Sequence, residues 1–403
     1  MDRNATPART LSHQPPLVRE AVADSRDPGA VGHLRRGLGP GPFALITLFV
    51  SPDADFAAVM AGAQEAYPDV SVTGCTTAGE IGPEGYAEGA IVALALPAAH
   101  FRAETMVIEN LAALDPQRLI GEMIRRRVAL ARAAPGWPQD FAFLMVDGLS
   151  LCEDALTSAM LAGLGTAPLI GGSAGDGTRF GRTLVGAGGR AFRSAAVLSF
   201  VRTDCPVRAF SHDHLMPGRV RMVVTAADPK CRIVERINAE PAAREYARLL
   251  GKDPNQLSPL TFAAHPVVVR IGGRHHVRAI QRVAENGDLV FFSAIDEGLV
   301  LTLAEALPMA DRIEAELAGL ARHKPPDVIL GCDCVLRRIE AEQRQLRPAL
   351  SRILARHRVR GFSTYGEQIS GLHVNQTLTG LAIYPPPAAS GPDPEQAPPC
   401  PTA

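Results

Sequence analysis

The 403-residue sequence has little of what marks several large classes of protein. Aromatic residues make up only 5% of it, with one tryptophan, and the formal net charge is -1. A balance this close to neutral lacks the broad positive field that nucleic-acid binding requires, so we expect no nucleic-acid partner. The arginine clusters in "MIRRRV" and "VLRRIE" are offset by acidic residues elsewhere and are typical of solvated helix faces.

Long apolar runs and an ordered cysteine framework are also missing. No run of 18 or more apolar residues occurs, which predicts no membrane-spanning helix, and the first residues lack the apolar core of a secretory signal. The 7 cysteines are odd in number and show no disulfide or zinc spacing, including the pair in "CDC". These absences predict a reduced, cytoplasmic protein.

Ordinary globular composition is present instead, with 46% hydrophobic and 21% charged residues. Apolar runs alternate with amphipathic segments, which predicts an α+β fold of two mixed α/β domains whose largely antiparallel sheets are flanked by helices. We expect a mobile arm over residues 1–39 with a short helix over 17–27, domains over 40–238 and 239–384, and a disordered proline-rich tail over 385–403.

Several local signals place elements more closely. "DADFAAVMAGAQEAY" and "CEDALTSAMLAGLG" show helical spacing, the first with an aspartate near its start and the second ending at Gly165. "TLVGAGGRAFRSAAVLSFVR" predicts a hairpin, and "NGD" predicts a second hairpin turn.

Three glycine-containing turns follow apolar strands, in "GCTTAGE", "LIGGSAGDG" and "LGCDC". Such turns let the backbone approach a ligand, although a single one more often means a tight turn with no ligand. None fits a phosphate-loop or dinucleotide motif. Three together favour a shared ligand cleft. Its candidate residues in these segments are Gly74, Cys75, Thr76, Glu80, Gly171, Gly172, Ser173, Asp176, Cys334 and Arg337.

The last strand pair, "GFSTYGEQISGLHVNQTLTGLAIY", supplies the other candidates, Tyr365, Glu367, His373 and Asn375. His373, Asn375 and Thr377 alternate and are expected on one face of a single strand. Buried and unpaired, each polar group would cost about 1–3 kcal/mol, so partners must exist if that face points inward.

Other chemistry remains open at this point. No G-x-S-x-G or H-E-x-x-H motif occurs. An enzyme using Cys75 or Cys334 as nucleophile beside Glu80 or Glu367 is one alternative, and a scaffold that only docks partners is another. "SHDH" places two histidines on one face of a strand, where they are most often surface residues but are also suited to a metal.

The ordered set "GCTTAGEI", "LIGGSAGDG", "EPAAREYARLLG", "CVLRR" and "GFSTYGEQI…HVNQTLTGLAIY" resembles the two-part FIST sensory domain. The resemblance implies an intracellular sensor that is not an enzyme and that binds a small molecule or gas. Its partner would be a separate sensor histidine kinase or cyclic-di-GMP enzyme, and a homodimer is compatible with it.

The stretch from "SHDHLMPGRVRMVVTAADP" to "CDCVLRRIE" is similar to the nitric oxide-sensing haem proteins called NosP. This similarity implies a non-covalent haem with a histidine axial ligand, His214 first, then His212, then His373. The cations available for the haem propionates would be Arg219, Arg221, Arg337 and Arg338.

Overall fold

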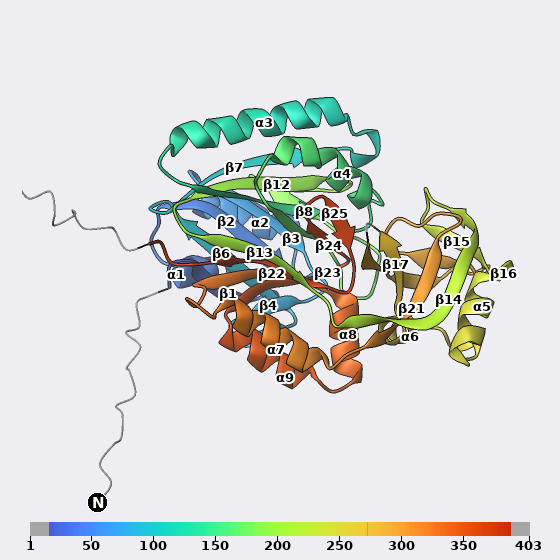
Figure 1. The fold of residues 1–403 in the computed structure, drawn as a ribbon. Helices are drawn as coiled ribbons and strands as arrows, with labels where there is room; N and C mark the ends of the chain where they lie inside the picture. The colour runs from blue at the N-terminus through green and yellow to red at the C-terminus, as the bar shows by residue number, and fades with distance from the viewer. Residues whose placement is uncertain (1–15, 272, 388–403) are drawn as a thin grey trace, which may run out of the picture.

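The computed structural model describes residues 16–271 and 273–387. Within these residues a strand–helix–strand–helix–strand–hairpin–strand unit occurs three times (Figure 1). The first repeat comprises β1 (Arg19–Asp24), α1 (Ala30–Leu38), β2 (Phe43–Val50), α2 (Phe56–Ala66), β3 (Ser71–Thr76), β4 (Glu80–Gly82), β5 (Gly85–Ala87) and β6 (Ala90–Pro97).

The second and third repeats follow the same order. The second comprises β7 (Phe101–Ile108), the short 3-10 helix η1 (Leu111–Ala113), α3 (Pro116–Ala133), β8 (Gln139–Val146), α4 (Glu153–Leu164), β9 (Leu169–Ser173), β10 (Val185–Ala187), β11 (Arg190–Phe192) and β12 (Ala196–Thr203). The third comprises β13 (Val207–His212), α7 (Met309–Leu320), β22 (Val328–Cys334), α8 (Val335–Gln343), α9 (Arg347–Arg356), β23 (Val359–Thr364), β24 (Glu367–Ile369), β25 (Leu372–Val374) and β26 (Leu378–Ile383).

Each repeat builds one six-stranded sheet by borrowing a hairpin from another repeat. The orders are β1-β6-β2-β3-β10-β11, β7-β12-β8-β9-β24-β25 and β13-β26-β22-β23-β4-β5. Only the central pairs β2–β3, β8–β9 and β22–β23 are parallel among the described strands. The hairpin of each repeat thus extends the sheet of another, and the three repeats cannot separate without breaking strand pairs.

The three sheets share one core and each has a second core of its own. Phe49 stacks on Phe362 at 4.8 Å between ring centroids and meets Phe143 edge-on at 6.2 Å, so side chains of all three sheets meet at the centre. The outer faces are covered by α1 and α2, by α3 and α4, and by α7 and α9. Two-sided burial explains why the inner strands are continuous apolar runs.

The three repeats with their three sheets form what we call the body. A smaller module, residues 215–306, is inserted into the third repeat between β13 and α7 and lies beside the body (Figure 1). Its sheet strands and helices are β14 (Leu215–Asp228), β15 (Ile233–Ile237), β16 (Glu240–Pro241), α5 (Ala242–Leu250), η2 (Pro254–Gln256), α6 (Pro259–Ala264), β17 (Val267–Ile271), β18 (Arg274–Arg278), β19 (Ile280–Val283), β20 (Leu289–Phe291) and β21 (Val300–Ala306). The two connections to the body lie together, because the Leu307 N–H donates to the His214 carbonyl at 2.7 Å.

The α+β prediction, with largely antiparallel sheets flanked by helices, is confirmed. The predicted helix boundaries also hold for α2, where the Asp55 side chain accepts from the Ala58 N–H, and for α4, which ends at Gly165. Both predicted hairpins form, as β10–β11 and as β19–β20.

The prediction for the start of the chain is wrong where the structure describes it. Residues 19–24, expected in a helix of a mobile arm, form β1 and pair with β6. Pairing with an existing sheet edge outweighs a weak local helical pattern. The Leu17 and Val18 N–H groups also donate to the Asp327 carboxylate. Residues 1–15 and 388–403, and the predictions made for them, lie outside the described residues.

Candidate functional site

The turns that follow β3, β9 and β23 meet at one end of the body. The Gly175 N–H donates to the Thr76 carbonyl at 3.0 Å, and the Ala78 N–H donates to the Ser363 carbonyl at 2.9 Å. The Tyr365 N–H completes the ring by donating to the Ser173 carbonyl at 3.2 Å. The structure therefore brings together segments predicted to meet, but they contact one another directly and the pockets lie around them.

Two predicted carboxylates, Glu80 and Glu367, are fully buried at this end. Glu80 accepts from the Thr77 hydroxyl and from the Ala90 N–H at 3.1 Å. Glu367 accepts from the Thr364 hydroxyl and from Thr377. Burial raises the pKa of Glu80 to about 7 and that of Glu367 to about 8.

Asp176, the acidic residue of the second turn, organises its own loop. Its carboxylate accepts from the N–H groups of Phe180, Gly181 and Arg182 and from the hydroxyl of Tyr365. Burial raises the pKa of Tyr365, so the phenol stays protonated and donates. Through these bonds Asp176 and Tyr365 stabilise the conformation of the turn.

One pocket, of about 310 Å³, lies between the first turn and α8. We call it the α8 pocket. Its walls include Gly79, Glu80 and Arg338. The guanidinium of Arg338 is 4% exposed; its Nη2 bonds Ala87 and Glu88, while its buried Nη1 has no partner among the described residues. A Cβ on Gly79 would lie 1.8 Å from that Nη1, so only glycine lets the cation approach this turn.

The other candidates fall into different places. Thr76 and Asp176 border a pocket of about 520 Å³ beside the start of α2. Asn375 borders one of about 400 Å³ between the module and β24–β25. The remaining candidate glycines and Ser173 lie in buried strand ends. Gly171 and Gly172 have no room for a Cβ, because backbone or side-chain atoms lie within 2.5 Å of its position.

The segment from His373 to Thr377 is not the single strand that the sequence predicts. β25 ends at Val374, and Gln376 has φ 53 before β26 begins at Leu378. This break lets Thr377 turn back onto Glu367, and the Asn375 side chain donates to the Tyr365 carbonyl at 3.3 Å. The hydrogen bonds from Thr377 to the buried Glu367 carboxylate therefore outweigh continuous strand pairing through this segment.

The candidate nucleophiles do not suit covalent chemistry. Cys75 and Cys334 are fully buried, and burial raises the pKa of both thiols well above 9.0. A thiolate is the reactive form of cysteine, so neither residue is activated at neutral pH.

His214 is fully buried and both of its ring nitrogens are occupied. Nδ1 lies 2.9 Å from Arg337 and Nε2 lies 2.9 Å from Glu340. Arginine can only donate, so Nδ1 accepts and Nε2 carries the hydrogen that it donates to the carboxylate. Burial lowers the pKa of His214, which favours this neutral ring.

The other two predicted axial histidines differ from each other. His373 Nδ1 lies 3.1 Å from the Gln368 amide, and its Nε2 lies 3.4 Å from the Phe292 carbonyl. His212 keeps a buried Nε2 without a partner among the described residues. As arranged here, His214 and His373 do not fit haem ligation, and His212 alone of the three offers a ring nitrogen.

Arg337, predicted as a ligand contact, lies in a buried hydrogen-bond network. Its Nε donates to Asp333 at 2.7 Å, and Asp333 also accepts from the Tyr86 hydroxyl. Arg219 and Arg221, predicted as cations for the propionates, lie on β14 of the module.

Sequence reasoning missed the threefold repeat and the pocket role of Arg338. The signal was present: each of the three turns carries glycine followed by an acid, at Gly79–Glu80, Gly175–Asp176 and Gly366–Glu367. Arg338 was considered only for a haem propionate, because its approach to Gly79 depends on the exchanged hairpin.

Comparison with known proteins now identifies the family. The family model of the FIST N domain matches residues 44–240, and that of the FIST C domain matches residues 242–370. No curated protein gives a significant match. FIST domains are small-ligand sensing domains of signalling proteins, and they are sensory rather than catalytic. Among the described helices, none has the length and apolar character needed to cross a membrane. The chain belongs to the FIST family and carries both its N and C domains.

Proposed function

We propose that this chain is a sensor that binds a small zwitterion in the α8 pocket and reports its presence to a separate signalling partner. The observation that carries the proposal is the buried Arg338 Nη1, which has no acceptor among the described residues. A buried donor left unpaired costs about 1–3 kcal/mol, so an anionic ligand group would relieve that cost.

The pocket also favours a positive charge on the ligand. Asp53, Glu88 and Glu342 border it together with Arg338. These carboxylates would repel a purely anionic ligand, whereas they would attract an ammonium group. A carboxylate at Arg338 and an amine toward the acids match this arrangement. The volume of about 310 Å³ limits the ligand to a small metabolite.

Helix α8 gives such a ligand a route to the rest of the molecule. Val335 and Ile339 border the pocket and also pack in the core that joins the body to the module. Glu340, the residue after Ile339 on the same helix, contacts His214 at the crossing into the module. A shift of α8 on binding would therefore reach the module, whose outer surface is available to a sensor kinase, a cyclic-di-GMP enzyme or a second copy of the chain.

The test is thermal unfolding with a panel of small compounds, comparing α-amino acids with acetate and succinate, which lack the amine. At a ligand concentration 100 times Kd, stabilisation of about 2.7 kcal/mol is expected for the wild type. Arg338→Met should abolish this stabilisation. Arg347→Met is the matched control, because Arg347 pairs with the same Glu88 and Glu342 but does not border the pocket.

Two results would contradict the proposal. Equal stabilisation of the wild type and Arg338→Met would place the ligand elsewhere. Stabilisation by acetate as strong as by any amino acid would remove the zwitterion class.

Haem binding with nitric oxide sensing is the second proposal. It rests on the free Nε2 of His212, whose pKa is lowered to about 4 by burial and by Arg337, so the ring is neutral at pH 7 as iron ligation requires. Haem would supply an iron that binds the gas. Hemin titration of the purified protein should then shift the Soret band, and His212→Ala should remove the shift while His33→Ala, an exposed control, keeps it. No shift in the wild type ends this proposal.

A further inference from the structure

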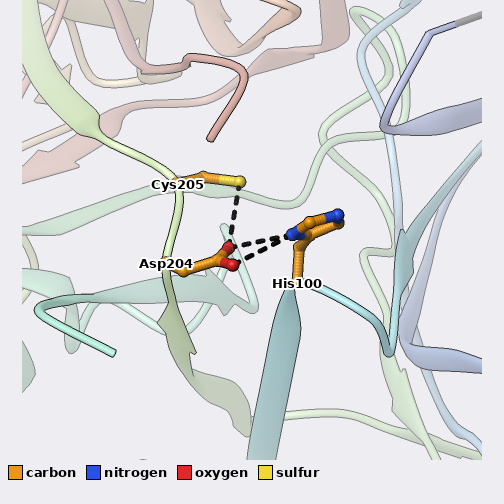
Figure 2. Close-up of side chains that lie close together, drawn as sticks. All are labelled: His100, Asp204 and Cys205. Atoms are coloured by element: carbon orange, nitrogen blue, oxygen red, sulfur yellow. Dashed lines mark hydrogen bonds and ion pairs between the residues drawn. The ribbon is translucent and has the colours of Figure 1, made fainter. Parts of the chain in front are cut away.

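Three side chains with metal-binding atoms converge where the loops between repeats meet. His100 precedes β7, and Asp204 and Cys205 lie between β12 and β13. Their side chains point toward one another (Figure 2). His100 Nδ1 lies 3.0 Å from Asp204 Oδ2, and Cys205 Sγ lies 3.6 Å from Asp204 Oδ1. All three ligand atoms lie within 4.8 Å of one another.

These separations are close to those of ligands around a tetrahedral zinc ion. With Zn–N and Zn–O near 2.1 Å and Zn–S near 2.3 Å, neighbouring ligand atoms lie about 3.3–3.7 Å apart. The sulfur–oxygen distance already falls in that range. The shorter nitrogen–oxygen distance is a hydrogen bond, which opens by a few tenths of an ångström when an ion replaces the shared proton.

The surroundings hold the two loops in register. The Thr203 hydroxyl donates to the His100 carbonyl at 2.8 Å and accepts from the Cys205 N–H at 3.0 Å. One side chain thus fixes the backbone on both sides of the cluster. Supporting bonds of this kind orient the ligands of metal sites in proteins.

The three side chains differ in their exposure to solvent. Cys205 is fully buried, whereas the side chains of His100 and Asp204 are 32% and 30% exposed. An ion can therefore enter from solvent, and a water molecule can complete the coordination.

We propose that His100, Asp204 and Cys205 form a binding site for a divalent transition metal, with zinc as the natural occupant. On binding, the thiol proton leaves to solvent and a sulfur–metal bond forms. His100 Nδ1 releases to solvent the proton that it shares with Asp204, the ring takes up a proton at Nε2 in its place, and the Nδ1 lone pair then binds the ion. Nitrogen, sulfur and carboxylate donors together favour zinc over magnesium or calcium. The ion fastens the junction of the first and second repeats to that of the second and third.

Cobalt(II) titration of the full-length protein tests the site, because a thiolate–cobalt bond gives a charge-transfer absorption in the near ultraviolet. The wild type should show this band at one equivalent, zinc should displace it, and binding should weaken at least tenfold for each unit that the pH falls. Cys205→Ser should abolish the band. His100→Gln and Asp204→Asn, at partly exposed positions, should weaken binding by tenfold or more even if Cys205→Ser fails to fold.

The control is the double variant Cys231→Ser/Cys400→Ser, which removes thiols outside the cluster and should leave the titration unchanged. Loss of the band in this variant would assign the metal to those thiols and overturn the proposal. A wild type with no thiolate band at one equivalent, or an unchanged titration in His100→Gln and Asp204→Asn, would overturn it as well.

Discussion

Glu80 and Glu367 occupy the same place in two repeats of one fold. Each follows a glycine, accepts from a threonine hydroxyl three residues earlier, and accepts from a backbone N–H ten residues later. Ala90 is the first residue of β6, and Thr377 immediately precedes β26, the last strand of its repeat. Each carboxylate therefore ties the turn after β3 or β23 to the return strand of the same repeat, which pairs with β2 or β22.

The first prediction concerns the pH dependence of stability at Glu367. Its folded pKa is about 8, against 4.5 for an unperturbed glutamate. Between these values the folded protein holds a proton that the unfolded chain releases, so the free energy of unfolding falls as pH rises from about 4.5 to about 8. Each pKa unit corresponds to about 1.4 kcal/mol. Glu367→Gln should flatten this fall by a few kcal/mol.

Urea unfolding at pH 5, 6, 7, 8 and 9 measures this effect. The glutamine amide can donate to Thr364 while its oxygen accepts from Thr377, so the variant keeps the hydrogen bonds. Exposed Glu65→Gln is the control and should leave the profile unchanged. The assignment is contradicted if the free energy of unfolding rises between pH 5 and 8 and does so by the same amount in the wild type and in both variants.

The second prediction concerns the phenol of Tyr365. Its hydroxyl donates to the Asp176 carboxylate and accepts from the Asp176 N–H at 3.1 Å. Tyr365→Phe leaves buried groups unpaired and should cost about 1–3 kcal/mol. Hydrogen exchange should speed up at Phe180, Gly181 and Arg182, whose N–H groups donate to the Asp176 carboxylate. Tyr384→Phe, which loses a single bond to the Leu320 carbonyl, should leave that exchange unaltered.

The third prediction tests the exchanged hairpin of the first repeat. A Cβ on Gly85 would lie 2.4 Å from the backbone of Ser351 in α9, and Gly85 has φ +95. Gly85→Ala should therefore destabilise the protein by more than 2 kcal/mol, combining a backbone clash with left-handed strain. Gly287→Ala has a similar φ of +90 but nothing within 4 Å, so it should show the strain alone, about 1 kcal/mol. Equal losses in chemical denaturation would argue against the packing of β4–β5 on α9.

The fourth prediction concerns the contact between module and body. Arg232 of the module lies 2.7 Å from Glu153 and 3.0 Å from Asp154 at the start of α4. Arg232→Gln leaves Glu153 buried without its cation and should cost about 3–5 kcal/mol. Replacing both partners, as in Arg232→Met/Glu153→Met, should recover most of that loss. Exposed Arg236→Gln is the control for lost positive charge. A double variant no more stable than Arg232→Gln would show that the pair is not coupled.

Local physics made part of this fold predictable. Asp55 caps the start of α2 and Gly165 caps the end of α4, and both ends were predictable because capping residues act within one turn of chain. The apolar runs of β2, β8 and β22 are long enough to mark buried strands without further information. The convergence of the turns after β3 and β9 with the turn after β23 was also predictable, since similar turns follow similar strands. The third predicted glycine turn, "LGCDC", is instead the end of β22 and continues directly into α8.

Long-range pairing was not predictable in the same way. β1 carries a helix-like pattern, and only the edge of β6 makes it a strand. The partners of His214 lie 123 and 126 residues away in the sequence. The residues next to His214 therefore do not indicate that it is buried in a charged network. His100 and Cys205 are also distant in sequence, and their proximity follows from β7 and β12 running side by side.

The paired crossings at His214 and Leu307 have a practical consequence. Because a carbonyl and an N–H only 2.7 Å apart mark where the chain leaves the body and where it returns, residues 215–306 form a loop with adjoining ends. One or two glycines would span that gap, so the three-sheet framework could be produced without its appendage. Comparing the shortened and complete proteins would then assign recognition to one part and reporting to the other.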